Sequence, residues 1–483
     1  MKKFIIFGVV LALLVPTLAM AATEFSLGGF IKMDMMWDSD GGVGKNMNAL
    51  PSRNNDNNNK HGRLKFTAQG SRFNFTIKGP DLWGAKTSGF IEMDFDSAER
   101  NALNTAFSAS NNYTPRLRHA MFRFNWPTSE LLFGQYFSMF CEWYAESAED
   151  GPLQMTGTPT ARNAQVRFTQ TFMEDWTVAA SIGDPNMANL NNTLYNANIN
   201  NGQSAETPQL QGKIKYAHDF WGKAAYYGKP TPFTIQFVGG WQRNVQRNTA
   251  PGIGQAAQQN TLFGENNRTN LVVLPSTWNT VTNFTTNNNK NQYVDPWLAM
   301  GSLFIPVIPT QSANLAGTAS ILTQWWIGQG VEAFGFTGTS GAKFRFDSVN
   351  LLAASVNTPS FNYDTELLTK FGGFVQGQYY FNNQWFVNAL YGVSKAMNVS
   401  RSNVNVFGQN VGLIGFVNGN EPQTVQQMSA TLWYRPIQAI KFGLQYSYLA
   451  AHYYQNNTTP NLTNNSSNFG DNHRVEFVGF FYF

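Results

Sequence analysis

The chain of 483 residues is 42% hydrophobic but only 13% charged, whereas soluble domains are about 25% charged. Its formal net charge of +4 is too small and too dispersed to indicate a nucleic-acid partner or a polybasic membrane contact. The single cysteine, Cys141, excludes an intrachain disulfide, so other interactions must hold the fold.

The N-terminus has the pattern of an export signal. Lys2 and Lys3 precede an apolar run over residues 4–14, which is shorter than the roughly 20 residues of a membrane-spanning helix. Ala19-Met20-Ala21 then supplies the small residues that signal peptidase accepts. We therefore predict a signal peptide at residues 1–21 and one domain over 22–483, starting at Ala22 or Thr23. The alternative is an uncleaved membrane anchor.

The first strand is expected over residues 25–37, directly after the predicted cleavage site, which leaves no room for an N-terminal plug. Ile31 and Trp37 share one face of this strand, and Lys32 and Asp34 share the other. In a transmembrane barrel, such alternation turns apolar side chains to lipid and polar ones to a wet lumen. The barrel must be closed, because lipid cannot satisfy the backbone groups of a free sheet edge.

The second strand, residues 63–78, changes phase in its middle. Leu64 and Phe66 face outward before Gly70-Ser71, whereas Phe73 and Phe75 face outward after it. One extra residue at Gly70-Ser71 would produce this change, so we predict a β-bulge there.

Further strands alternate in the same way and are joined by short turns or long Asn-rich segments. They are expected at 89–96, 116–126, 131–137, 162–172, 176–183, 209–219, 233–243, 371–381, 385–394, 424–435, 440–450 and 473–483. The region 290–360 should add at least one more pair, drawn from 296–306, 324–336 and 343–356. The predicted fold class is therefore all-β, a transmembrane antiparallel β-barrel of about 16 strands with 18 as the alternative, in the size range of aqueous pores.

Tryptophans beside the short turns indicate an aromatic girdle at a membrane interface. The short turns are then periplasmic, and the long loops at 41–59, 186–201, 247–291 and 454–472 are extracellular. The last strand alternates aromatic residues and ends on Phe483, which resembles the closing strand of bacterial outer-membrane proteins. We therefore expect a bacterial outer-membrane location. The girdle tryptophans are Trp83, Trp126, Trp176, Trp385 and Trp433.

Three internal motifs are specific enough to compare with known proteins: Arg116-Leu117-Arg118-His119-Ala120, Gly134-Gln135-Tyr136-Phe137-Ser138-Met139-Phe140 and Arg162-Asn163-Ala164-Gln165. In this order they resemble the DcaP-like branch of the Gram-negative trimeric porin superfamily. The resemblance covers mainly residues 60–170. It implies a homotrimeric 16-stranded channel whose third extracellular loop folds into the lumen. It also implies passive diffusion of small hydrophilic solutes, with anions such as dicarboxylates favoured.

The residues themselves suggest a charged constriction. Opposite charges across a narrow lumen would orient dipolar solutes. The alternative is a solvated acidic loop among scattered charges, and the loop charge taken alone predicts the opposite, cationic preference. The loop carries Glu142, Glu146, Glu149 and Asp150, and the opposing basic wall would comprise Lys65, Arg72, Arg116, Arg118 and Arg167.

Strict alternation creates a conflict on the strand at 116–126. If Arg116 and Arg118 face the lumen, then Leu117 and Met121 face lipid, but so does Arg123. Either a bulge intervenes or Arg123 lies at the membrane interface.

Other chemistry is not indicated. The five histidines have no metal-ligand spacing, and no Gly-X-Ser-X-Gly elbow occurs. We expect no cofactor, no metal, no nucleic-acid partner and no enzymatic activity; the partners are outer-membrane lipid and small solutes. Two alternatives remain: a structural barrel that sheaths an electron-transfer or secretion partner, and an outer-membrane hydrolase.

Overall fold

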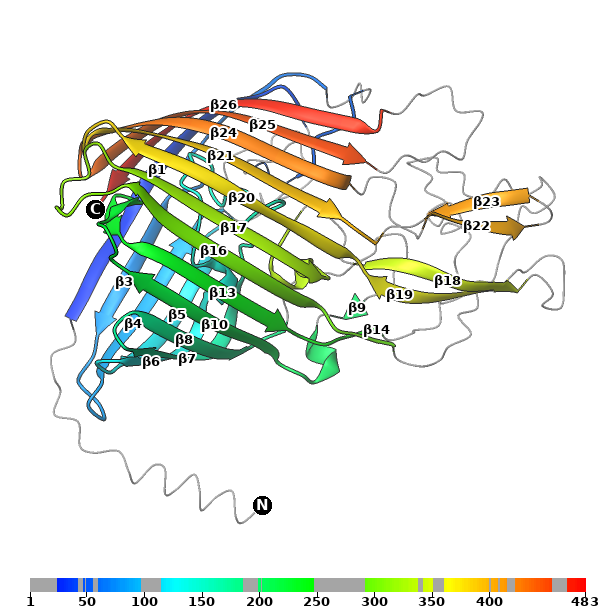
Figure 1. The fold of residues 1–483 in the computed structure, drawn as a ribbon, viewed down its shortest axis with the longest axis horizontal. Coiled ribbons are helices and arrows are strands. Elements are labelled where there is room, and N and C mark those ends of the chain that lie inside the picture. Colours follow the sequence, from blue (N-terminus) through cyan, green and yellow to red (C-terminus); the bar gives the residue numbers. More distant parts are fainter. Residues whose placement is uncertain are drawn as a thin grey trace, which may run out of the picture.

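A closed antiparallel β-barrel forms the body of the computed structural model (Figure 1). It has 16 strands, because β2 and β3 both pair with β1 and form one interrupted strand, while β26 pairs with β1 to close the ring. The structure describes residues 24–41, 47, 49–54, 60–96, 114–185, 199–200, 202–246, 292–337, 342–350, 360–398, 401–406, 409–414, 422–453 and 467–483. Among these residues, no helix is long and apolar enough to cross a bilayer.

The barrel strands agree closely with the expected ranges. They are β1 (Glu24–Asp38), β2 (Arg63–Thr67), β3 (Arg72–Lys78), β4 (Lys86–Asp94), β5 (Arg116–Asn125), β6 (Ser129–Phe137), β7 (Arg162–Phe172), β8 (Trp176–Gly183), β10 (Gln209–His218), β13 (Phe233–Trp241), β16 (Trp297–Ile308), β17 (Ala319–Gln329), β20 (Thr369–Tyr380), β21 (Trp385–Ala396), β24 (Pro422–Ile437), β25 (Ile440–Tyr453) and β26 (Phe469–Tyr482).

The count of 16 is confirmed and the alternative of 18 is wrong. Of the described residues in the region 290–360, only β16 and β17 belong to the wall. Its third candidate lies in β18 (Ala342–Asn350), which pairs with β19 (Ser360–Leu367) in a hairpin separate from the barrel sheet.

Smaller elements lie around the barrel. Three short strands form a separate sheet, β9 (Ile199–Asn200), β14 (Asn244–Gln246) and β15 (Gln292–Val294), while β22 (Arg401–Val406) pairs with β23 (Gln409–Ile414). Single turns of 3-10 helix are η1 (Met139–Cys141), η2 (Gly202–Ala205) and η3 (Val331–Phe334).

Side chains alternate between lipid and lumen as expected. On β1, Ile31 is 58% exposed while its neighbour Lys32 is 1% exposed. The predicted bulge in the second strand is confirmed: four residues separate Thr67 from Arg72, whereas three separate their β1 partners Phe30 and Asp34. The bulge explains how both halves keep their apolar residues outward.

A second bulge, between β4 and β5, resolves the conflict over Arg123. Glu92 pairs with His119 while Met93 pairs with Leu117, so Arg118 is an extra residue on β5. Beyond this point the alternation is reversed. Arg123 therefore faces the lumen and pairs with Glu130 at 2.9 Å. The expectation that Met121 faces lipid is wrong for the same reason.

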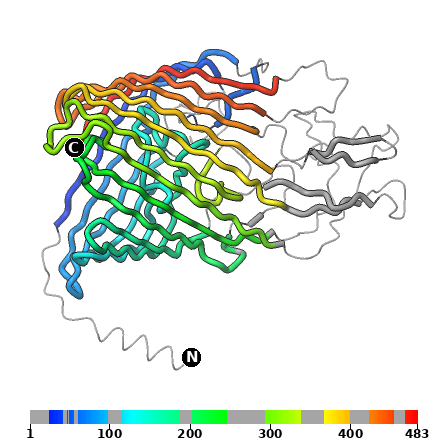
Figure 2. The backbone as a smooth tube through the Cα atoms, in the orientation of Figure 1, coloured from blue at the N-terminus to red at the C-terminus, as the bar shows by residue number. Residues whose placement is uncertain are grey.

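The short turns gather at one end of the barrel, together with the C-terminus (Figure 2). Trp83, Trp176 and Trp385 are exposed there, and Trp126 donates its indole N–H to the Trp83 carbonyl at 3.0 Å. Trp433 was wrongly assigned to the girdle, because it is fully buried on the lumen side. Residues 1–23 and most of the long loops at 41–59, 186–201, 247–291 and 454–472 lie outside the described residues.

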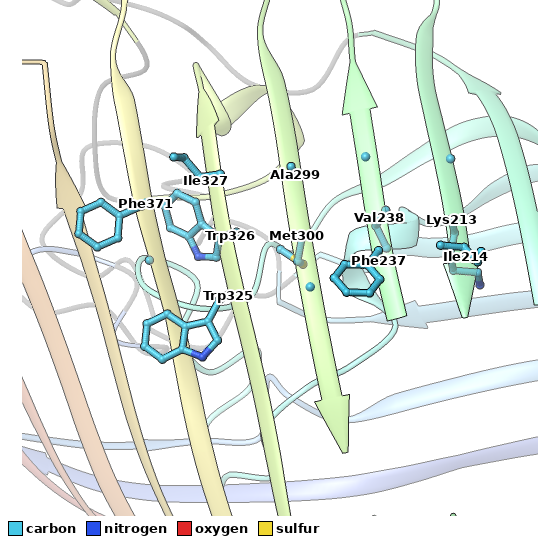
Figure 3. Close-up of a pocket in the computed structure, with 14 residues that line it drawn as sticks. Lys213, Ile214, Phe237, Val238, Ala299, Met300, Trp325, Trp326, Ile327 and Phe371 are labelled. Carbon is cyan, nitrogen blue, oxygen red and sulfur yellow. The ribbon is translucent and has the colours of Figure 1, made fainter. Parts of the chain in front are cut away.

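The outer face carries an apolar groove of about 710 Å³ across β10, β13, β16, β17 and β20 (Figure 3). Its exposed walls include Phe237, Trp325 and Phe371, and Gly239 and Ala299 contribute to its floor. Because these side chains point away from the lumen, the groove lies on the lipid-facing surface and is not part of a path for solutes.

Candidate functional site

Residues 138–161, which connect β6 to β7, fold into the barrel and are called the lumen loop. The loop starts at η1, where the Ser138 hydroxyl caps the turn by accepting from the Phe140 N–H at 3.4 Å. Ser138 Oγ and the Met139 N–H both donate to Gln211 Oε1 of β10, at 3.0 and 2.9 Å. These contacts turn the chain inward as soon as β6 ends.

The motifs at residues 134–140 and 162–165 hold the root of the lumen loop. Gln165 Nε2 donates to the carbonyls of Tyr136 and Phe137 at 3.1 and 3.2 Å, and Arg167 also donates to the Phe137 carbonyl. The Cys141 thiol donates to the Pro159 carbonyl at 3.0 Å and so ties the two arms of the loop together. Burial raises the pKa of Cys141 to about 12, which makes it a structural thiol.

The lumen loop lies against the wall formed by β17 to β25. Trp326 Nε1 donates to the Thr156 carbonyl at 2.9 Å, and Gln376 Nε2 donates to the Glu146 carbonyl at 2.8 Å. The Ala148 N–H donates to Gln445 Oε1 at 2.8 Å. Aromatic contacts reinforce this position, such as Trp143 stacked on Phe304 with ring centroids 5.9 Å apart.

The exposure of lumen-facing side chains differs between the two sides of the loop. Gln376, beneath the loop, is 4% exposed, whereas the lumen-facing side chain of Arg116 on β5 is 34% exposed. Arg72 and Arg123 on the same side are also only partly buried. The more exposed of the paired arginines therefore lie on the wall of β3 to β7, called the arginine-bearing wall.

Two of the four loop carboxylates meet members of the expected basic wall. Glu142 forms an ion pair with Lys213 of β10 and lies 3.7 Å from Arg167. Asp150 lies 3.2 Å from Lys32 and 3.8 Å from Arg72. The loop thus bridges to basic side chains near its start, at Glu142, and in its middle, at Asp150.

The other two loop carboxylates point toward the opposite wall. Glu146 accepts from Lys441 at 2.6 Å and from Gln378 at 2.8 Å. Glu149 is buried and accepts from Gln427 at 3.1 Å. Burial raises the pKa of Glu149 well above its ordinary value, and nearby Glu476 adds to this effect, while Arg474 and Lys32 oppose it. Neither side chain is brought together with the arginines of β5.

The arginines of β5 are paired with acidic residues of β4. Arg116 contacts both oxygens of Asp94, at 2.9 and 2.7 Å, and Asp96 at 3.2 Å. Arg118 contacts Glu92 at 2.6 Å and Asp94 at 2.7 Å. The sequence alone does not indicate these pairs, because they depend on the register between β4 and β5.

Lys65 occupies β2 rather than the arginine-bearing strands. It faces the lumen, since its neighbours Leu64 and Phe66 are exposed on the outer face, and it is half-buried. The candidate site therefore combines Arg72, Arg116 and Arg118 on the strand wall, Arg167 at the root of the loop, and Glu142 and Asp150 of the loop.

A second inward element was not expected from the sequence. Residues 219–232, between β10 and β13, contain a hairpin of β11 (Ala224–Tyr226) and β12 (Lys229–Thr231), called the inward hairpin. Tyr226 Oη accepts from the Tyr144 N–H at 3.0 Å, and Tyr227 Oη donates to the Ala145 carbonyl at 2.9 Å. The hairpin thus supports the lumen loop from the short-turn end. The connection between β10 and β13 is longer than the other described turns at this end of the barrel. This length is the feature of the sequence that could have indicated the hairpin.

Within the described residues, no group of three or more His, Cys, Asp or Glu side chains could hold a metal ion. The charged groups that the site does bring together are paired guanidinium and carboxylate side chains.

No family model matches the chain, and no curated protein matches it. Among solved structures, the outer membrane channel DcaP of Acinetobacter baumannii is 16% identical over 96% of this chain and 98% of its own, with a TM-score of 0.57. An anion-selective porin from Comamonas acidovorans is 8% identical over 96% and 100%, with a TM-score of 0.47. Salmonella typhi OmpF, in complex with daunomycin, is 11% identical over 95% and 97%, with a TM-score of 0.44.

The likeness to DcaP confirms the resemblance seen in the motifs as a likeness of fold. The chain is a 16-stranded outer-membrane barrel of the porin fold, with its third loop inside the lumen.

Proposed function

We propose that this outer-membrane barrel is a passive diffusion channel for small hydrophilic solutes and that it favours anions. The observation that carries the proposal is the partial exposure of Arg72, Arg116 and Arg123, from which we infer a passage between the arginine-bearing wall and the lumen loop. Such a lining offers charge and hydrogen bonds without a closed binding pocket, which suits entry and exit of small solutes.

The anion preference rests on which charges line the passage. Arg116 is the most exposed of the paired lumen arginines, whereas Asp94, its main partner, is buried. Glu146 and Glu149 are turned away from the passage. Arg116 therefore presents more accessible charge than the two carboxylates with which it pairs, and guanidinium groups bind carboxylates in a planar, bidentate manner.

Two alternative functions are less well supported by the described residues. A sheath for a partner protein needs a wide lumen, but the lumen loop and the inward hairpin occupy the centre of this barrel. A hydrolase needs a nucleophile activated by a neighbouring base. The Cys141 thiol is buried and engaged in a structural hydrogen bond. We therefore propose a channel without enzymatic activity.

The proposal is tested by single-channel recording of the purified protein in a planar bilayer under a salt gradient. We expect steady conductance and a reversal potential that indicates anion preference. Arg116→Gln should move the reversal potential toward cations, because it removes one partly exposed positive charge while the negative charge of Asp94 stays. Lys86→Gln, which removes an equally positive but highly exposed charge at the short-turn end of β4, should leave it unchanged.

A silent but correctly folded barrel would contradict the channel function. An unchanged reversal potential in Arg116→Gln would remove this arginine from the selectivity filter while leaving the channel in place.

A further inference from the structure

The apolar groove on the outer face is built along a row of residues that pair across neighbouring strands. Gly212 pairs with Gly239, which pairs with Ala299 on the next strand, and a Cβ added at either glycine would meet nothing within 4 Å. These three small residues form the floor of the groove, whose volume is about 710 Å³. The whole row, called the outer row, comprises Gly212, Gly239, Ala299, Ile327, Phe371 and Lys395.

Bulky apolar side chains border this floor. Ile214, Phe237 and Trp325 lie one step closer to the short-turn end on the same face, and all three are exposed. The rings of Phe237 and Trp325 lie on opposite sides of β16 (Figure 3). Lipid tails are as apolar as these side chains, so close packing rather than removal from water decides what fills the groove. An unfilled groove would forfeit the dispersion contacts of the side chains that line it.

An unpaired lysine ends the outer row. Lys395 pairs with Phe371 in register, and it is exposed on the outer face while its neighbours Ser394 and Ala396 are buried. In the part of the chain that the structure describes, its ammonium group has neither an acidic nor a hydrogen-bonding partner. Lys395 lies next to the last residue of β21, at the end opposite the short turns. A lysine on the lipid-facing surface is tolerated at such an end because it reaches the membrane interface.

We propose that the groove holds an acyl chain of a phosphate-bearing lipid of the outer leaflet and that the lipid phosphate pairs with Lys395. The chain would lie along the outer row from Phe371 to Gly212, where missing side chains allow close approach to the backbone. The phosphate would accept charge-assisted hydrogen bonds from the Lys395 ammonium group. The site is independent of the diffusion function proposed above, because it lies on the opposite face of the strands.

Charge and shape favour a lipid over a second copy of the chain as the occupant. Lys395 requires an anion at the membrane interface, and lipid headgroups supply one there. A flexible acyl chain can follow the concave floor between Phe237 and Trp325. The stiff wall of a neighbouring barrel would bridge the same floor and leave it empty.

The test is a titration of the purified, detergent-solubilised protein with lipid A and with dephosphorylated lipid A, followed by native mass spectrometry. We expect the dephosphorylated form to bind about fivefold more weakly, as for the loss of one lysine–phosphate contact. Lys395→Gln should weaken lipid A binding by the same factor and leave the binding of the dephosphorylated form unchanged. Gly239→Leu, which fills the floor, should abolish binding of both forms.

The matched controls are Gly377→Leu and Lys86→Gln, which should bind lipid A like the unmodified protein. Gly377 is also an exposed glycine with nothing within 4 Å of an added Cβ, but it lies outside the groove, and Lys86 lies at the short-turn end. The shift in gel mobility on heating verifies that each variant is folded. Gly212→Leu fills the same floor from β10 and replaces Gly239→Leu if the latter does not fold.

Equal binding of lipid A in all variants, or equal losses in Gly239→Leu and Gly377→Leu, would overturn the lipid site. Equal binding of both lipid forms to the unmodified protein would overturn the role of Lys395. The same spectra give the number of subunits. A number that falls in Gly239→Leu would overturn the proposal by showing that a second copy of the chain covers the groove.

Discussion

Charged side chains that are buried in the lumen are stabilised by ion pairs with opposite charges rather than by exposure to water. Lys441 is an example, since its ammonium group lies 2.6 Å from Glu146 and 3.7 Å from the centre of the Trp433 ring. Both charged side chains are almost completely buried, at 5% and 4% exposure. Because Glu146 belongs to the lumen loop and Lys441 to β25, this pair fastens the loop to the wall.

Removing one member of this pair should destabilise the barrel strongly. Lys441→Met leaves the Glu146 carboxylate buried without its cation, and we expect a loss of about 3–5 kcal/mol in the free energy of unfolding. The free energy of unfolding is measured by urea titration, in which the folded fraction is determined from the shift in gel mobility on heating. The double variant Lys441→Met/Glu146→Gln should recover most of the loss, whereas Lys86→Gln at an exposed pair should cost at most about 1 kcal/mol. Equal effects at both sites would contradict the role assigned to the buried pair.

At the scale of elements, β6 and β7 form a rigid base from which the lumen loop departs. Gly134 is central to it, because its φ of +120° is one that other residues rarely adopt. A Cβ added there would clash with the Ala120 carbonyl and lie 2.7 Å from Met121 Cα. Gly134 is thus required because β5 approaches β6 closely at this position, shortly before the lumen loop begins.

Gly134→Ala should therefore destabilise the protein by about 1–3 kcal/mol, the typical cost of backbone strain. Since the substitution displaces the loop root, the channel current should also become noisier than in the unmodified protein. Urea titration and single-channel recording measure these effects. The control is Gly377→Ala on β20, where an added Cβ meets nothing within 4 Å, and a change within about 0.5 kcal/mol is expected. If Gly134→Ala leaves the free energy of unfolding unchanged, β5 and β6 can separate at this position without cost.

At the scale of the whole molecule, the lipid-facing surface and the export signal lead to one further prediction. We expect the mature protein to be a homotrimer of subunits that begin at Ala22 or Thr23. Native mass spectrometry of the protein purified from the outer membrane gives both the number of copies and the subunit mass. A monomer would contradict the trimer that the family resemblance implies, and a subunit retaining Met1 would contradict the signal peptide.

The sequence by itself determined the class of fold, nearly all strand ranges and which faces meet lipid. These features follow from a local, two-residue alternation of apolar and polar side chains, which each strand carries independently of the others. The bulge at Gly70-Ser71 was predictable for the same reason, because a change of phase inside one strand is visible without knowing its partners. The presence of an acidic loop was equally readable.

Only the tertiary structure decided how side chains are oriented and paired in the lumen. The bulge at Arg118, which turns Arg123 inward, depends on the register between β4 and β5. The orientation of Glu146 depends on Lys441, which lies 295 residues away in the chain. The burial of Trp433 and the inward course of the 219–232 hairpin depend on contacts across the lumen. Such contacts form only when the ring of strands closes, so no local pattern of residues records them.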